Sequence, residues 1–237
     1  MAAEKFDWGQ IINLPTPPTH KTFGHQVLHF YPLNKPFWEP SQTFVDRHLS
    51  KAIQYVSDAE VLKFGSDAAA SQEGMFLEFG VCSGKTINFI AALNPRKKIF
   101  GFDSFEGLPE DWRAECKKGA FSFKQPNFLP PVLNNVELIK GWFSDTLPAF
   151  LETHEGPVAF VHIDCDLYSS TSCVFQNLKD RIQPGTIIVF DELYNYPGFE
   201  NHELKALQEF LDSTGYQAEY LAYNIHHEQI AIRIRSP

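Results

Sequence analysis

The chain has 237 residues, of which 43% are hydrophobic, and its formal net charge is −9. This length and composition fit one large domain with a full core, and they exclude collagen-like and disordered chains. The negative charge gives no electrostatic footprint for nucleic acid or for an anionic membrane, so neither is expected as a partner.

The N-terminal residues and the cysteines bear on location. The first ten residues, MAAEKFDWGQ, lack the apolar run of a secretory signal, and the four cysteines show no CxxC spacing. No apolar run approaches the roughly 18 residues that a membrane-spanning helix needs. We therefore expect reduced thiols, no membrane segment and a cytoplasmic location.

The first part of the chain differs in character from the rest. Residues 1–42 are rich in proline and aromatic residues, which predicts an irregular arm. Apolar residues at helical spacing then predict a helix over about 43–64. We expect residues 1–73, the arm and this helix, to act as a lid that binds substrate, and residues 74–237 to form the core.

From residue 75 onward, short apolar runs alternate with helical patterns. This alternation predicts an α/β fold with a Rossmann-like, doubly wound, mostly parallel sheet. The last two runs are expected to form a hairpin, which makes the last strand antiparallel. The expected strands lie at 75–80, 98–103, 136–141, 158–164, 185–192, 218–223 and 229–234. The expected helices lie at 84–93, 171–182 and 201–213.

Acidic residues follow several of the expected strands. Ligands of doubly wound sheets bind outside the carboxyl ends of the strands, where these acids would meet. Helix capping explains one or two of them, but a larger group at one edge would repel itself without a cation. The acids are Glu78, Asp103, Asp164, Asp166, Asp191 and Glu192.

The segment EFGVCSGKT, residues 78–86, ends like a phosphate-binding P-loop but is one residue too short to be one. It also carries Glu78, which would repel phosphate. The pattern E-x-G-x-x-x-G instead fits close approach of a small molecule that carries a cationic group. Asp103 follows about 20 residues later, where an acid binds ribose hydroxyls, and the G-x-G-x-x-G of nicotinamide sites is absent.

Two further acidic segments indicate a metal site. Asp164 and the pair Asp191 and Glu192 end strands expected to be neighbours, about 4.8 Å apart. Carboxylate oxygens are hard ligands that favour Mg²⁺ or a similar divalent ion over zinc. Asp166 lies two residues beyond Asp164 and is the candidate base, with a histidine such as His227 as the alternative.

With these motifs together, the sequence resembles the class I, S-adenosylmethionine-dependent and Mg²⁺-dependent small-molecule O-methyltransferases. The branch that it resembles contains the macrocin, mycinamicin and novobiocin-pathway enzymes. The matching segments are LEFGVCSGKTI, GFDSFEGLP, GWFSDTLP, HIDCDLYSST and FDELYNYPGFENHE. They lie within residues 75–203, and the expected C-terminal hairpin also fits the seven-stranded sheet that the resemblance implies.

The resemblance implies a role for each matching position. The metal ligands would be Asp164, Asp191 and Glu192, and the base would be Asp166. The cofactor-binding residues would be Glu78, Gly80, Val81, Gly84, Thr86, Asp103, Ser104, Trp142, Phe143, Ser144 and Asp164. Lys85 departs from the small residue that sugar-modifying relatives tend to carry, and the arm 1–42 matches nothing in the family.

The implied reaction is methyl transfer from S-adenosylmethionine to a hydroxyl of a small molecule, a sugar or a natural-product intermediate. Two alternatives stay open at this point: a catechol-type O-methyltransferase, and a non-catalytic protein that binds the cofactor or a partner. Leu167 stands where a catechol-type enzyme would carry lysine, which counts against the first. Unpaired buried carboxylates cost stability, which counts against the second. The acceptor and a homo-oligomeric state are left open.

Overall fold

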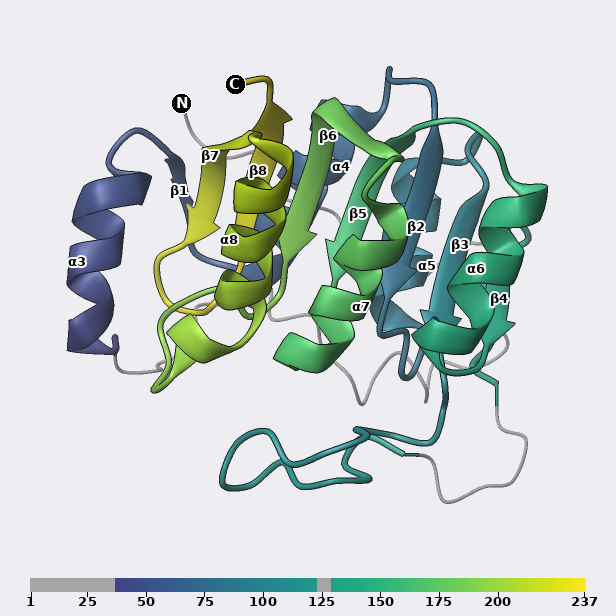
Figure 1. Ribbon diagram of the computed structural model, residues 1–237, viewed down its shortest axis with the longest axis horizontal. Coiled ribbons are helices and arrows are strands. Elements are labelled where there is room, and N and C mark those ends of the chain that lie inside the picture. Colours follow the sequence, from purple (N-terminus) through teal and green to yellow (C-terminus); the bar gives the residue numbers. More distant parts are fainter. Residues whose placement is uncertain (1–36, 123–128) are drawn as a thin grey trace.

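The computed structural model describes residues 37–122 and 129–237. They form one sheet with the strand order β1-β7-β8-β6-β5-β2-β3-β4, and helices cover both of its faces (Figure 1). Strands β2 to β6 run parallel to their neighbours of that set, while β8 is antiparallel to both β6 and β7. The expected Rossmann-like, doubly wound fold with an antiparallel last strand is therefore confirmed.

The seven expected strands are all present, and a short eighth strand, β1, pairs in parallel with β7 at the sheet edge. The strands are β1 (Ile53–Tyr55), β2 (Met75–Phe79), β3 (Ile99–Asp103), β4 (Val136–Lys140), β5 (Val158–Ile163), β6 (Ile182–Phe190), β7 (Gln217–Asn224) and β8 (Ile230–Arg235).

The main helices fall into two layers. Helices α4 and α5 lie behind the sheet in Figure 1, and α6, α7 and α8 lie in front of it. Their bounds are α4 (Asp58–Ala69), α5 (Lys85–Leu93), α6 (Phe143–Thr153), α7 (Tyr168–Leu178) and α8 (Glu203–Thr214). The short segments are η1 (Glu39–Ser41), α3 (Gln42–Phe44), η2 (Val45–Leu49) and η3 (Phe199–Asn201). No helix within the described ranges is long and apolar enough to cross a membrane.

The prediction of a single helix over 43–64 is wrong. Helical residues 42–49 end before β1, and α4 begins a new helix at Asp58. The break has a clear cause, because Ser57 caps α4: its hydroxyl accepts a hydrogen bond from the Glu60 amide at 3.3 Å and donates to the Glu60 carboxylate at 2.8 Å. Helix α6 was not expected, and Pro148 inside it is the residue that argues against a helix.

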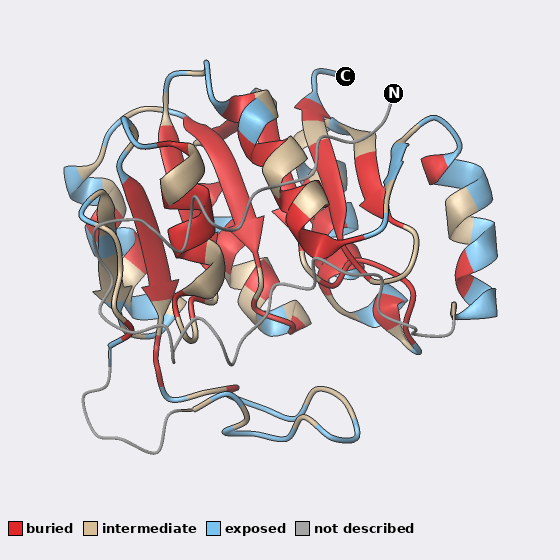
Figure 2. Cartoon of the chain, turned by 180° about the vertical axis from the view of Figure 1, so that it is seen from behind, coloured by how far each residue is buried: buried red, intermediate tan, exposed pale blue. Residues whose placement is uncertain are grey.

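The core explains why the parallel strands read as continuous apolar runs. All five residues of β2 and all six of β5 are buried, because helices cover both faces of a parallel sheet (Figure 2). On one face, Val61 and Leu62 of α4 pack in the same apolar cluster as Phe76, Phe160 and Val189. Helix α4 thus contributes to the core, and the part of the expected lid that precedes residue 37 lies outside the described residues.

We expect Leu62→Ala to lower the free energy of unfolding by about 2–5 kcal/mol, because it opens a cavity between α4 and the sheet. Leu62 is 3% exposed. The matched control is Lys63→Ala on the outer side of the same helix, which should change stability by no more than about 0.5 kcal/mol. Urea unfolding measures both. Equal, small effects would mean that α4 is a detachable element.

Candidate functional site

A cavity of about 380 Å³ lies at the carboxyl ends of the parallel strands. Most residues predicted for the site line it: Gly80, Val81, Thr86, Asp103, Ser104, Trp142, Phe143, Asp164, Asp166, Asp191 and Glu192. Three predicted cofactor residues do not appear in its lining: Glu78, Gly84 and Ser144. The long segment after β3 passes below this edge of the sheet (Figure 1).

The glycine loop between β2 and α5 is held directly against the end of β5. Gly80 has a φ of +93°, and a Cβ added there would lie 1.7 Å from the backbone oxygen of Asp164. Its amide donates to Phe102 O at 3.0 Å, and Asp164 N donates to Phe79 O at 2.9 Å. Only glycine fits between these strands, so the loop and the carboxylate of Asp164 keep a fixed spacing.

Glu78 lies behind the cavity and braces the loop. Its side chain is fully buried, and Thr86 donates its hydroxyl hydrogen to Oε1 at 2.5 Å. The other oxygen, Oε2, lies 3.7 Å from His162 Nδ1 and makes no hydrogen bond within the described residues. Burial raises the pKa of Glu78, against the lowering effect of His162 and Thr86. Thr86 therefore ties the first turn of α5 to β2, while Glu78 stays out of direct reach of the cavity.

Asp103 organises the same loop from the end of β3. Its Oδ2 accepts hydrogen bonds from the amides of Val81 at 2.9 Å and Cys82 at 2.7 Å, and its Oδ1 accepts one from the Phe105 amide at 2.6 Å. Oδ1 can accept a further bond, and the side chain lines the cavity. Its predicted contact with ribose stays a prediction.

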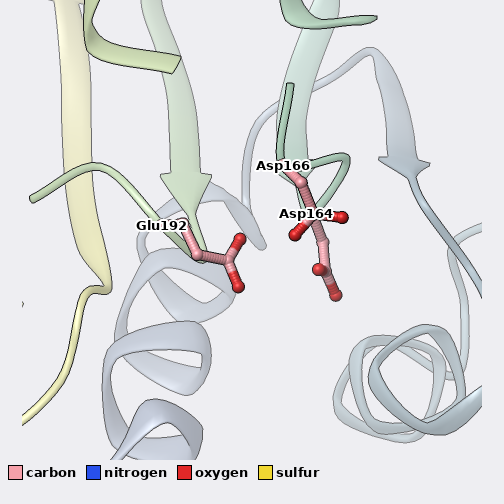
Figure 3. A group of neighbouring side chains, drawn as sticks. All are labelled: Asp164, Asp166 and Glu192. Carbon is pink, nitrogen blue, oxygen red and sulfur yellow. The ribbon is translucent and has the colours of Figure 1, made fainter. Parts of the chain in front are cut away.

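Three carboxylates that follow the neighbouring strands β5 and β6 lie close together (Figure 3). We call Asp164, Asp166 and Glu192 the acidic cluster; one carboxylate oxygen of each lies within 4.8 Å of the others. Asp166 adopts a φ of +64°, a strained conformation that is often found at functional sites. Asp191, the third ligand expected from the sequence, lies next to the cluster and accepts a hydrogen bond from Gln229 Nε2 at 3.1 Å.

The cluster carries a high electrostatic cost without a cation. Burial raises the pKa of Asp164 and of Glu192 well above the ordinary values, and the charge of Asp191 raises both further. Burial, followed by Asp191, raises the pKa of Asp166 to about 7, with Arg113 opposing. Asp191 differs: burial raises its pKa, but Glu192, His162, His227 and Gln229 together lower it below the ordinary value.

A further carboxylate, Glu203 at the start of α8, lies beneath the cluster and was not predicted from the sequence. Its side chain is fully buried, and neither oxygen has a hydrogen-bond partner within the described ranges. Burial and the charge of Asp166 raise the pKa of Glu203 well above its usual value. The backbone groups of Glu192 and Asp166 lower the pKa of Glu203, although neither forms a hydrogen bond with its carboxylate.

The long segment after β3 is fastened beside the cavity by Arg113. Its guanidinium lies between the rings of Trp112 and Tyr196, 3.8 Å and 3.9 Å from their centroids, and forms a two-pronged ion pair with the buried Glu228. Trp112 lines the cavity, and its Nε1 is a buried donor with no partner in residues 37–122 and 129–237. Spacing along the chain gave no signal for this contact, because it depends on how a long loop folds.

Other lining residues were also missed as site residues by sequence reasoning. The turn of the expected β7–β8 hairpin places His227, the alternative base, at the cavity, and it also brings Gln229 there, which was not expected. The remaining residues come from α4, the glycine loop, the segment after β3 and the region around α7: Asp58, Cys82, Ser83, Lys85, Gly107, Leu108, Pro109, Phe121, Cys165 and Ser170. Cys165 is buried as expected, with its sulfur 3.4 Å from Thr171 Oγ1.

The raised pKa values predict how stability depends on pH in chelator-treated protein. The unfolded chain releases its carboxyl protons near pH 4, whereas Asp166 in the folded chain keeps its proton up to about 7. The folded state binds more protons over this window, so the free energy of unfolding should fall as pH rises from about 4 to about 7. Urea unfolding of Asp166→Asn should show a weaker fall than wild type; an equal or steeper one would contradict the raised pKa.

Comparison with known proteins agrees with this geometry. Residues 77–193 match the family model described as a methyltransferase domain. A curated relative from Streptomyces olivaceus is 29% identical over 140 residues, which cover 50% of this chain and 52% of the relative. Its name is 8-demethyl-8-(2,3-dimethoxy-alpha-L-rhamnosyl)-tetracenomycin-C 4'-O-methyltransferase. The chain thus spans about half the length of the curated relative that it matches.

Solved structures share the fold. The calicheamicin methyltransferase CalS11 aligns with a TM-score of 0.60 at 22% identity, over 90% of this chain and 91% of that chain. The O-methyltransferase NovP aligns with a TM-score of 0.53 at 20% identity, over 76% of this chain and 79% of that chain. The expectation of a methyltransferase is confirmed, because residues 77–193, which hold the glycine loop and the acidic cluster, match the methyltransferase-domain model. The solved structures show that the fold is shared.

Proposed function

We propose that the protein transfers a methyl group from S-adenosylmethionine to a hydroxyl of a small molecule, a sugar or a natural-product intermediate. The observation that carries this proposal is the position of the acidic cluster in the same cavity as the glycine loop. One side of the cavity then suits a nucleoside cofactor, and the other suits activation of an oxygen nucleophile. The curated relative is named as a 4'-O-methyltransferase of a rhamnosyl-bearing tetracenomycin, and this name supports the same class of acceptor.

The cofactor side of the site rests on the loop and its neighbours. Gly80 lines the cavity while its backbone packs against Asp164, and Asp103 fixes the loop while facing the cavity. Trp142 and Phe143 also line the cavity, next to the ends of β3 and β4. We assign the ribose to Asp103 with Ser104, and the adenine to Trp142 and Phe143, with Ser144 nearby. The methionine part would lie along Gly80, Val81, Gly84 and Thr86, braced by Glu78.

The residues of the acidic cluster fit a hard divalent ion such as Mg²⁺. Every donor is a carboxylate oxygen, and Glu192 Oε2 is buried without a hydrogen-bond partner within the described part of the chain. We propose Asp164 and Glu192 of the cluster, together with Asp191 beside it, as the ligands, which leaves Asp166 as the base. When bound, such an ion lowers the pKa of a coordinated hydroxyl and fixes its direction.

Asp166 is the proposed base. Its place in the acidic cluster brings its carboxylate beside the other acids, where an acceptor hydroxyl held by the ion would lie within its reach. Asp166 accepts the proton of the acceptor hydroxyl as the oxygen attacks the methyl carbon. The bound cofactor would supply the methyl group and keep the electron pair of the broken carbon–sulfur bond, as S-adenosylhomocysteine. Orientation of the reactants in the cavity supplies several kcal/mol of the barrier reduction.

Several expectations remain proposals at this stage. The lid role of residues 1–73, the absence of nucleic acid and membrane partners, a homo-oligomeric state and the cytoplasmic location rest on sequence alone. A catechol-type acceptor would use the same cluster, and Leu167 remains the residue that counts against it. A non-catalytic protein would have no use for three converging carboxylates that repel one another in a cavity.

The division between ligand and base predicts different losses in two variants. Asp166→Asn keeps the shape but cannot accept a proton, so it should keep its affinity for Mn²⁺ and lose about 10²–10⁴-fold in single-turnover rate with an acceptor that wild type methylates. Asp191→Ala should lose Mn²⁺ affinity and rate together. The measurements are Mn²⁺ titration by electron paramagnetic resonance and quenched-flow methyl transfer.

The exposed Glu137→Gln removes a carboxylate away from the cavity and should change neither quantity. If Asp166→Asn loses the ion, Asp166 is a ligand and the proposed division is wrong. If Asp166→Asn turns over normally, the base lies elsewhere, with His227 as the next candidate at the cavity.

A further inference from the structure

The cavity contains one cationic side chain that the proposed chemistry does not use. Among the described residues that line it, Lys85 is the only lysine or arginine, whereas six are aspartate or glutamate. The Lys85 side chain is half-buried at the wall of the cavity. It is acted on by the charges of Asp58 at the start of α4, Asp191 after β6 and Asp164 after β5.

The backbone around Lys85 favours a negatively charged ligand. Lys85 is the first residue of α5, a helix of nine residues whose N-cap, Gly84, has a φ of +81° and offers no side-chain cap. The first amides of such a helix need acceptors, and the helix dipole favours an anion there. The ammonium and the uncapped helix end thus come from the same turn at the wall of the cavity.

S-adenosylmethionine carries one group of matching charge. Its sulfonium and α-amino groups are cations that suit the acidic surroundings, but its α-carboxylate would be repelled by every carboxylate in the cavity. Resting on the proposed function, we propose that Lys85, with the first amides of α5, binds the α-carboxylate of the cofactor. Lys85 is then a cofactor-binding residue that selects for the amino-acid end of the cofactor.

The layout of the cavity agrees with this direction. Asp103 and Trp142 follow β3 and β4, and the proposal places adenosine there. Lys85 instead begins α5, which follows β2, and the charges that act on it are those of Asp58, Asp191 and Asp164. A cofactor whose adenosine lies at the ends of β3 and β4 would extend its methionine part toward Lys85 at the start of α5. Burial is the main cause that lowers the pKa of Lys85, and a bound carboxylate would replace the water that burial removes.

The test compares two ligands that differ only in the carboxylate: S-adenosylhomocysteine and its decarboxylated analogue, S-adenosyl-3-thiopropylamine. Calorimetry on wild type should show tighter binding of S-adenosylhomocysteine by about 10- to 100-fold, the scale of a charged hydrogen bond. Lys85→Met should lose about that factor for S-adenosylhomocysteine and keep wild-type affinity for the analogue. Lys85→Arg should recover part of the loss. The matched control is Lys98→Met, which removes an exposed cation outside the cavity.

The outcomes separate this assignment from the function on which it rests. If wild type binds the two ligands equally, or if Lys85→Met weakens both by the same factor, the ammonium only balances the acidic surroundings and the assignment is overturned. If wild type binds neither ligand, the proposed cofactor is wrong as well. The wild-type comparison needs no variant, so the assignment stays testable even if Lys85→Met does not fold.

Discussion

The constraint on which the site depends is the repulsion among carboxylates held at one edge of the sheet. Asp164, Asp166 and Glu192 converge there, with Asp191 beside them and the buried Glu203 beneath. Burial and mutual repulsion raise the pKa of four of these five groups. A fold keeps such an arrangement at a cost of stability, and a bound cation is the simplest compensation. In the proposed activity, that cation would lower the pKa of the acceptor hydroxyl.

The fold couples this edge to the cofactor side through close backbone contact. Gly80 lies so near the end of β5 that a Cβ would overlap Asp164 O, and Asp103 holds the next two amides of the same loop. A shift of the glycine loop would therefore move Asp164 as well. Arg113 and Glu228 fasten the segment after β3 to the β7–β8 turn, which fixes a further wall of the cavity. The regions proposed for cofactor and acceptor are thus connected parts of one scaffold.

The sheet and most of the acidic edge could be predicted from the sequence for a physical reason. Buried parallel strands appear as apolar runs, and acids that follow such runs meet at one edge whatever the loops do. Sequence reasoning failed where local signals conflict: β1 interrupts an apolar pattern of helical spacing, and Pro148 lies inside α6. It also missed Trp112, Glu203 and the Arg113–Glu228 pair, because these contacts depend on tertiary packing of residues far apart in the sequence.

The central claim is that the acidic edge binds a divalent cation beside the cofactor. Crystals grown with S-adenosylhomocysteine and Mn²⁺ test it most directly, because anomalous scattering locates manganese independently of the protein. The account predicts one anomalous peak, in contact with Asp164 and Glu192 and next to the sulfur of S-adenosylhomocysteine. Clear density for S-adenosylhomocysteine with no peak between these carboxylates would contradict it.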